Sequence, residues 1–168
     1  MLETARLSLL PCDETLLEAV LAGNNILSQV IGANVPRRWT ENIHGFQFFS
    51  RKLKEDHSLE KWGVHLIVYR PENTLVGSCG YKGHPNEEGT VEIGYEIKAG
   101  FRERGLATEA ANALVDYAFT FPEVQKVMAH TAAESNASGS VLTKIGFKKV
   151  GEHLDPDDGL VWRWELLR

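Results

Sequence analysis

The segment that most constrains the fold runs from Gly100 to Ala110, because it joins two kinds of secondary structure through a turn rich in arginine and glycine. An alternating run, Thr90–Ile97, leads into this turn, and a run with helical periodicity, 106–121, follows it. The first N–H groups of a helix have no partner inside the helix, and the helix dipole places partial positive charge there. A strand, a turn of small residues and a helix therefore form a site that can bind an anion such as a pyrophosphate.

Length and composition narrow the class of protein. The 168 residues fit one domain covering 1–168, and 43% hydrophobic and 24% charged residues are typical of a globular protein. A net charge of −5 argues against a nucleic-acid partner. No apolar run approaches the roughly 20 residues that span a bilayer, and the first residues do not resemble a signal peptide. Cys12 and Cys79 are too isolated for a metal site or a disulfide framework, so we expect reduced thiols, no metal and a cytoplasmic location.

The order of the expected elements defines the fold class. Helices are expected after Asp13, over residues 41–56 with Thr40 as the N-cap, over 106–121, and from Ser135 or Asn136 to Lys144. The segment 26–38 has weak periodicity and is interpreted as a loop or short helix. Strands are expected over 6–10, 63–69, 74–81, 90–97, 124–131, 147–151 and 160–166. The prediction is an α+β domain with a mainly antiparallel sheet of about seven strands and four helices, in the order β-α-α-β-β-β-α-β-α-β-β.

Four sequence pieces in this order resemble the GNAT superfamily of acyl-CoA-dependent N-acetyltransferases. They are Val91–Tyr95 (VEIGY), the turn 101–110, the run Tyr117–Phe119, and Val141–Phe147. Within that superfamily the chain looks like the branch that acetylates alanine or serine N-termini of ribosomal proteins. The first 60 residues match only in element order.

The resemblance assigns a cofactor site to the turn. It implies that acetyl-CoA is the co-substrate and that its pyrophosphate is held by the turn and helix start, with Asn136 contacting the pantetheine arm. The implied cofactor-binding residues are Ile97, Arg102, Glu103, Arg104, Gly105, Leu106, Ala107, Thr108 and Asn136. The alternative for the turn is a tight strand–helix connection in which Gly105 is needed only for the backbone conformation. The alternative for Asn136 is a helix N-cap without a cofactor contact.

Glu92 and Glu96 are expected on one face of their strand, where a carboxylate can take a proton from an amine. The resemblance favours Glu92 as the general base, while a solvated face or a structural ion pair is the alternative. The resemblance also places Ile97 where two strands separate, with its backbone N–H polarising the acetyl carbonyl.

The group that protonates the departing thiolate is less well defined. Many family members use a tyrosine in the helix after the fifth strand, and this chain has Leu142 there. The ribosomal-protein branch points to Ser138 instead, which a helix-capping role would also explain. Asn136 lies two residues before Ser138, where the family spacing is three.

The sequence therefore predicts direct transfer of an acetyl group from acetyl-CoA to a primary amine, with a protein N-terminal amine as one candidate. Two alternatives stay open. The first is a small-molecule acetyltransferase acting on a polyamine or aminoglycoside, which an acidic cleft would favour. The candidates for such a lining are Glu14, Glu18, Glu41, Asp155, Asp157 and Asp158. The second is a non-catalytic CoA-binding module. A homodimer formed through the C-terminal strands is a further possibility on the resemblance.

Overall fold

The computed structural model describes the whole chain, Met1 to Arg168, and contains a single eight-stranded sheet in the order β1-β2-β3-β4-β5-β6-β8-β7. The strands are β1 (Leu2–Glu3), β2 (Leu7–Pro11), β3 (Val64–Tyr69), β4 (Thr74–Tyr81), β5 (Thr90–Ile97), β6 (Lys126–Ala132), β7 (Lys148–Asp155) and β8 (Gly159–Leu167). The α-helices are α1 (Glu14–Ala22), α2 (Asn24–Ile31), α3 (Ile43–Glu55), α4 (Leu106–Phe119) and α5 (Ala137–Ile145). Short 3₁₀ turns occupy His57–Glu60, Arg70–Glu72 and Ala99–Phe101.

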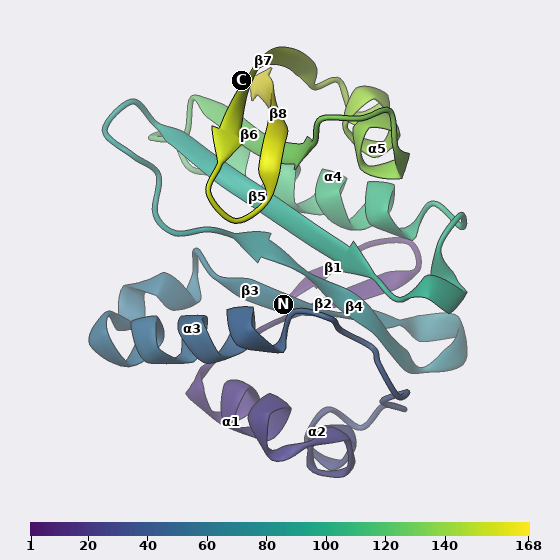
Figure 1. The fold of residues 1–168 in the computed structure, drawn as a ribbon. Coiled ribbons are helices and arrows are strands. Elements are labelled where there is room, and N and C mark those ends of the chain that lie inside the picture. Colours follow the sequence, from purple (N-terminus) through teal and green to yellow (C-terminus); the bar gives the residue numbers. More distant parts are fainter.

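The helices cover both faces of the sheet (Figure 1). Helices α1, α2 and α3 lie on one side and α4 and α5 on the other, and each side has its own hydrophobic core. The larger core places Ala110, Ala111 and Leu114 of α4 against the sheet, and all three are fully buried. Small residues on α4 let the helix lie close to the strands, as its alanine content suggests. None of the helices has the length and apolar character that crossing a bilayer requires.

The pairing of β5 positions the site. All other neighbouring strands are antiparallel, but β5 and β6 run parallel, and their register covers only Thr90 to Glu92 against Lys126 to Met128. Beyond Glu92 the two strands separate, whereas β5 remains paired with β4 as far as Ile97. An opening is therefore built into the middle of the sheet.

The predicted fold class is confirmed, with one strand and one helix more than expected. Strand β1 has only two residues, too few for an alternating pattern to be recognised. Helix α2 has only eight residues, which is short for a helical period to be recognised, and it buries Leu27 while Ile26 and Val30 stay about half exposed.

The start of α3 differs from the prediction. Thr40 does not cap the helix, which begins at Ile43. The Thr40 hydroxyl instead donates to the Glu96 carboxylate at 2.8 Å and accepts from the N–H of Asn42 at 3.0 Å. A tertiary contact with β5 therefore replaces the local cap. The expected caps at Asp13 and Asn136 are confirmed, since both side chains accept a backbone N–H of the following turn.

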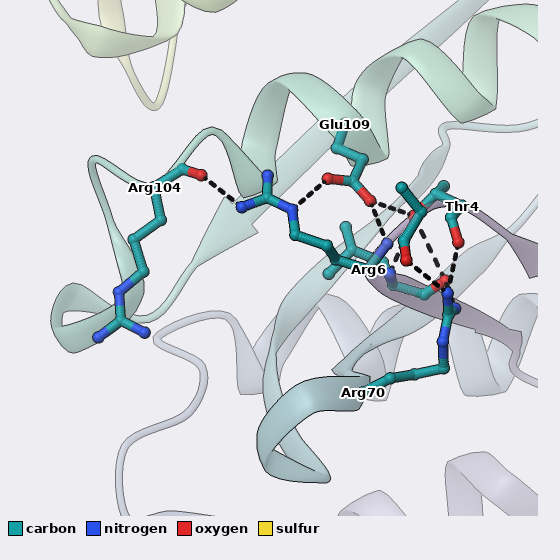
Figure 2. A network of polar contacts seen from close by, with 7 residues as sticks. Thr4, Arg6, Arg70, Arg104 and Glu109 are labelled. Atoms are coloured by element: carbon teal, nitrogen blue, oxygen red, sulfur yellow. Dashed lines mark hydrogen bonds and ion pairs between the residues drawn. The ribbon is translucent and has the colours of Figure 1, made fainter.

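The N-terminal segment is fastened to the first turn of α4 by a polar network (Figure 2). The Glu109 carboxylate accepts the N–H of Arg6 at 2.7 Å, its Nε at 2.8 Å, and the hydroxyl of Thr4. The Arg6 guanidinium also donates to the carbonyl of Arg104 at 2.9 Å, and Arg70 binds the carbonyls of Thr4 and Ala5. Residues at the beginning of the chain therefore stabilise the turn before α4.

Replacing Glu109 with Gln should lower the free energy of unfolding at pH 7 by about 2 kcal/mol, since a hydrogen bond to a charged group contributes about 1.5–3 kcal/mol. Burial alone would raise the pKa of Glu109, but the hydrogen bonds from Thr4 and Arg6 outweigh it and lower the pKa. A lowered pKa stabilises the fold above the unfolded value of about 4.3 and loses that effect as the pH falls further. Urea denaturation should therefore show the two proteins converging below about pH 4. Glu123→Gln, an exposed acid without a partner, is the control; equal losses for both variants would contradict the network's role.

Candidate active site

The turn before α4 has a backbone suited to an anion. Glu103 and Gly105 both have positive φ, at 63° and 76°, which is unusual for a residue with a side chain such as Glu103. None of the backbone N–H groups from Glu103 to Thr108 donates a hydrogen bond within the protein. Gly105 occupies the N-cap of α4 without a side-chain cap, so the helix start is open. Consecutive free N–H groups at a helix start form a concave donor surface for phosphate oxygens.

The two arginines of the turn differ in availability. The Nε of Arg102 donates to the carbonyl of Ile97 at 2.9 Å, while its terminal nitrogens make no contact. Arg104 folds back onto the turn, donating to Gly100 at 3.2 Å and pairing with Glu72 at 3.5 Å. Arg102 is therefore the better placed of the two to add positive charge beside the free N–H groups. Leu106 is buried in the core, so only its backbone contributes to this surface.

The separation of β5 and β6 leaves further donors free. The Lys82 N–H donates to the Glu92 carbonyl, and the Lys98 N–H donates to the Val76 carbonyl. The backbone N–H and C=O groups of the even-numbered residues of β5 therefore point toward β4. The odd-numbered Tyr95 and Ile97 therefore direct their N–H groups to the opposite edge, where β6 is no longer paired. The Ile97 N–H lies next to the turn and faces the opening, as the proposed carbonyl-polarising role requires.

Glu92 is the last residue of β5 that is paired with β6, and two donors bind its carboxylate. Lys82 Nζ lies 2.6 Å and His130 Nδ1 2.8 Å from the same atom, Glu92 Oε1, while Oε2 has no partner. Burial alone would raise the pKa of Glu92, but the hydrogen bonds and charges of His130 and Lys82 lower it overall. The carboxylate is thus kept ionised, with one oxygen fixed and the other free.

His130 completes this arrangement from β6. Its Nε2 is buried without a hydrogen-bond partner, and its ring stands edge-on to that of His153 at 5.0 Å. Because Glu92 is ionised and can only accept, Nδ1 of His130 is the donor in this contact. Ring packing on one side and the carboxylate on the other fix the imidazole.

Glu96 is engaged differently from Glu92. Both of its oxygens accept hydrogen bonds, at 2.8 Å from the Thr40 hydroxyl and at 2.6 Å from the Glu41 N–H. Glu96 therefore connects β5 to the segment before α3 and has less freedom to accept a proton than Glu92.

The residues expected around the departing thiolate meet at the start of α5. Asn136 caps that helix, with its side-chain oxygen accepting the Gly139 N–H at 3.0 Å. Ser138 is half-buried, its hydroxyl has no partner, and its carbonyl accepts the Tyr95 hydroxyl at 3.1 Å. Leu142 is fully buried in the core and cannot supply a proton. Tyr95 thus brings a phenol from β5 to the helix that lacks one.

A cavity of about 640 Å³ lies between α3 and the β4–β5 pair. Its lining residues are Asn42, Gly45, Phe46, Phe48, Phe49, Lys52, Leu59, Val64, Ser78, Cys79, Gly80, Tyr81, Lys82, Gly83, Gly94, Tyr95 and Glu96. The cavity reaches Lys82, which holds Glu92, and Gly94, which follows Glu92 on the same face of β5. No group of three or more His, Cys, Asp or Glu side chains is placed to bind a metal ion.

Sequence reasoning missed His130, Lys82 and Tyr95 as parts of this site. His130 is 38 residues from Glu92 in the chain, and Lys82 directly follows the end of β4. The sequence around each of them has no pattern that indicates a functional residue. Tyr95 belongs to the same VEIGY piece as Glu92, which carries the resemblance, and this was the one sequence signal for its place in the site.

Comparison with known proteins gives the class. Residues 6–148 match the family "Acetyltransferase (GNAT) domain", so the chain belongs to the GNAT acetyltransferases and the resemblance is confirmed. The N-acetyltransferase YjdG of Bacillus subtilis, itself uncharacterised, is 27% identical over 149 residues, covering 88% of this chain and 89% of its own.

Two solved structures share the fold at low sequence identity. RimL, a ribosomal alpha-N-protein acetyltransferase in complex with coenzyme A, superposes with a TM-score of 0.69 and 15% identity, covering 98% of this chain and 95% of its own. A spermidine N-acetyltransferase from Vibrio cholerae also gives 0.69, with 17% identity and coverage of 98% and 95%. Because proteins with different acceptors match equally well, the fold does not identify the amine.

Removing either donor to Glu92 should raise the pKa of that carboxyl group, because each donor favours its ionised form. NMR titration of the Glu92 side chain in Lys82→Met and His130→Phe tests this directly. His130→Asn keeps an N–H near the position of Nδ1 and should give a smaller rise than His130→Phe. An unchanged Glu92 pKa in both Lys82→Met and His130→Phe would contradict the described electrostatics.

Proposed function

We propose that the protein transfers the acetyl group of acetyl-CoA directly to a primary amine. The observation that carries this proposal is the presence of two groups of unpartnered backbone donors, Tyr95 and Ile97 on the edge of β5 and the N–H groups of 103–108 at the start of α4. Acetyl-CoA, when bound, supplies an activated acetyl thioester. The donors of residues 103–108, together with Arg102, would hold its pyrophosphate, and Asn136 at the start of α5 is the proposed contact to its pantetheine arm.

The fit of this site to a pyrophosphate rests on Gly105. A Cβ at this position would meet only the Arg6 side chain, at 3.4 Å, and would project from a backbone with positive φ. A larger side chain would therefore strain the turn and add bulk next to the free N–H groups. Glycine combines this conformation with the most open donor surface.

In the proposed reaction Glu92 acts on the amine. Full transfer of a proton from an ammonium with pKa near 10.4 to an ordinary carboxylate near 4.3 is unfavourable by about 8 kcal/mol, and a lowered Glu92 pKa increases that cost. The bound ammonium therefore first loses a proton to solvent, which gives the neutral amine whose lone pair attacks the thioester carbonyl carbon. Glu92 Oε2 accepts a hydrogen bond from this amine and takes a second proton from the nitrogen as the new N–C bond forms, when the nitrogen becomes a much stronger acid, and the C–S bond then breaks. The N–H bond breaks and an O–H bond forms on Oε2, from which the proton passes to solvent. Glu96, with both oxygens occupied, holds the segment before α3.

Two other groups support transfer. The Ile97 N–H would donate to the carbonyl oxygen on which negative charge develops. The hydroxyl of Ser138 is the proposed proton donor to the departing sulfur, and the Tyr95 hydroxyl fixes the helix turn that carries it. Both cysteines are buried, and burial raises the pKa of each thiol, so neither is a thiolate nucleophile at neutral pH. This supports direct transfer without a cysteine-bound acetyl group.

The alternative that the acceptor is a polycation loses support from the cavity. The acidic residues considered for such a cleft were Glu14, Glu18, Glu41, Asp155, Asp157 and Asp158, and none of them lines it. Glu96 is the one acid in its lining, alongside Lys52 and Lys82. A monoamine, whether a peptide N-terminus or a small molecule, therefore suits the charges of this lining better than a polyamine.

Gly105→Val should weaken CoA binding at least about tenfold, because the side chain covers donors that the phosphates need. Isothermal titration calorimetry measures this directly. Gly159→Val is the matched control, since Gly159 has a similar φ of 74° with open space around it, in the β7–β8 turn. Equal CoA affinity in the wild-type protein and Gly105→Val would overturn the assignment of the turn.

Glu92→Gln should lower kcat/KM for the amine by about 10²- to 10⁴-fold, the usual contribution of a positioned proton acceptor. CoA affinity should not change, since Glu92 lies away from the turn. Thiol release from acetyl-CoA in the presence of a panel of amines gives the rate. A wild-type protein that binds CoA tightly yet accelerates thiol release with no amine would instead support a non-catalytic module.

A further inference from the structure

We propose that the acceptor is a singly charged amine whose carbon skeleton carries an aromatic or comparably flat apolar group close to the nitrogen. This inference rests on the proposed function, because it takes the cavity beside Glu92 as the acceptor site. It is carried by three properties of that cavity, namely its walls, its floor and its charges.

The walls of the cavity are aromatic. Phe46, Phe48 and Phe49 are contributed by α3, and Leu59 and Val64 extend the apolar surface. Phe46 belongs to the core, but the Phe48 side chain is 55% exposed at the rim. An exposed phenyl ring beside a cavity gains most from a ligand that covers it, and ring-to-ring contact adds about 0.5–1.5 kcal/mol beyond the area buried.

The floor of the cavity has no side chains at its centre. Gly80 of β4 and Gly94 of β5 are direct cross-strand partners and both line the cavity. A Cβ on Gly80 would lie 2.3 Å from the Gly63 carbonyl oxygen, so glycine is needed there for the approach of β3. A Cβ on Gly94 would meet only Lys82 Cε, at 3.7 Å, so no packing within the protein requires glycine at this position. The bare backbone at Gly94 leaves a flat surface on which a planar group can lie.

The charges around the cavity admit one positive charge. Glu92 Oε2, next to the cavity, is a carboxylate oxygen without a partner, whereas both oxygens of Glu96, the one acid in the lining, accept hydrogen bonds. Lys52 stands on the α3 side, where it pairs with Glu55 at 3.3 Å and lies 5.8 Å from the centre of the Phe48 ring. A second ammonium further along the ligand would therefore meet lysine rather than acid, whereas an aromatic group would meet Phe48.

The test compares four amines, namely 2-phenylethylamine, phenylalaninamide, alaninamide and spermidine, by turnover and by calorimetric binding to the CoA-loaded protein. We expect kcat/KM for the two aromatic amines to exceed that of alaninamide and spermidine at least about tenfold. Tetrapeptides that begin with Phe or Ala then distinguish a peptide N-terminus from a free small molecule as the source of the aromatic amine.

Two variants assign the preference to the cavity. Phe48→Ala should lower kcat/KM for the aromatic amines about tenfold and leave alaninamide nearly unchanged, and Gly94→Val should block all acceptors while CoA affinity is retained. Ile26→Ala, which removes a 45% exposed apolar side chain from α2 outside the cavity, should change none of these values.

The outcomes separate this inference from the proposed function. Turnover of alaninamide or spermidine at the rate of the aromatic amines would overturn the inference and leave acetyl transfer intact. Binding of the aromatic amines that Phe48→Ala weakens, without turnover of any amine, would support the preference of the cavity for aromatic amines and overturn the proposed acetyl transfer. Failure of the aromatic amines both to bind and to react would overturn the inference.

Discussion

The arrangement depends on a hydrogen-bonding constraint in the middle of the sheet. Strand β5 is paired with β4 along one edge as far as Ile97, but its pairing with β6 ends at Glu92. The N–H groups on the open edge then have no strand to bind, and the turn that follows adds free donors at the start of α4. A single strand and its connection thus present a line of donors that a ligand with successive acceptors can satisfy, which no fully paired sheet would offer.

Three carboxylates near this line, those of Glu92, Glu96 and Glu109, are held by hydrogen bonds. Glu109 lies in the first turn of α4, where a free negative charge would compete with an anion for the helix start, and its ion pair with Arg6 neutralises it. Glu96 ties the segment before α3 to the sheet, and Glu92 is fixed through one oxygen. The uncompeted helix start and the free Oε2 of Glu92 next to the cavity both follow from how these acids are paired.

Local patterns in the sequence predicted the strands β3 to β6, the helix α4 and the turn between β5 and α4, because each of these segments has strong periodicity or diagnostic glycines. These local patterns gave wrong or missing predictions where tertiary contacts determine the position of a side chain. Thr40 has the residue type of a helix cap but binds Glu96 on a strand 56 residues away. The Lys82–Glu92–His130 cluster has the same origin, since it forms only when β4, β5 and β6 are side by side. The residue types of the proposed cofactor site come from the motif, whereas the walls of the cavity come from α3, in the region with the weakest resemblance.

The contact between Arg6 and Glu109 joins residues 103 positions apart, and with Arg104 it secures the turn that precedes α4. Contacts between residues so distant in the chain form only after a large loop has closed, which makes them late events in folding. The donor turn of a newly made chain therefore acquires its final support after α4 itself can form, when the first strands have joined the sheet. A ligand that binds this turn would select chains in which both distant segments have docked, and its binding would report completed folding rather than the mere presence of the helix.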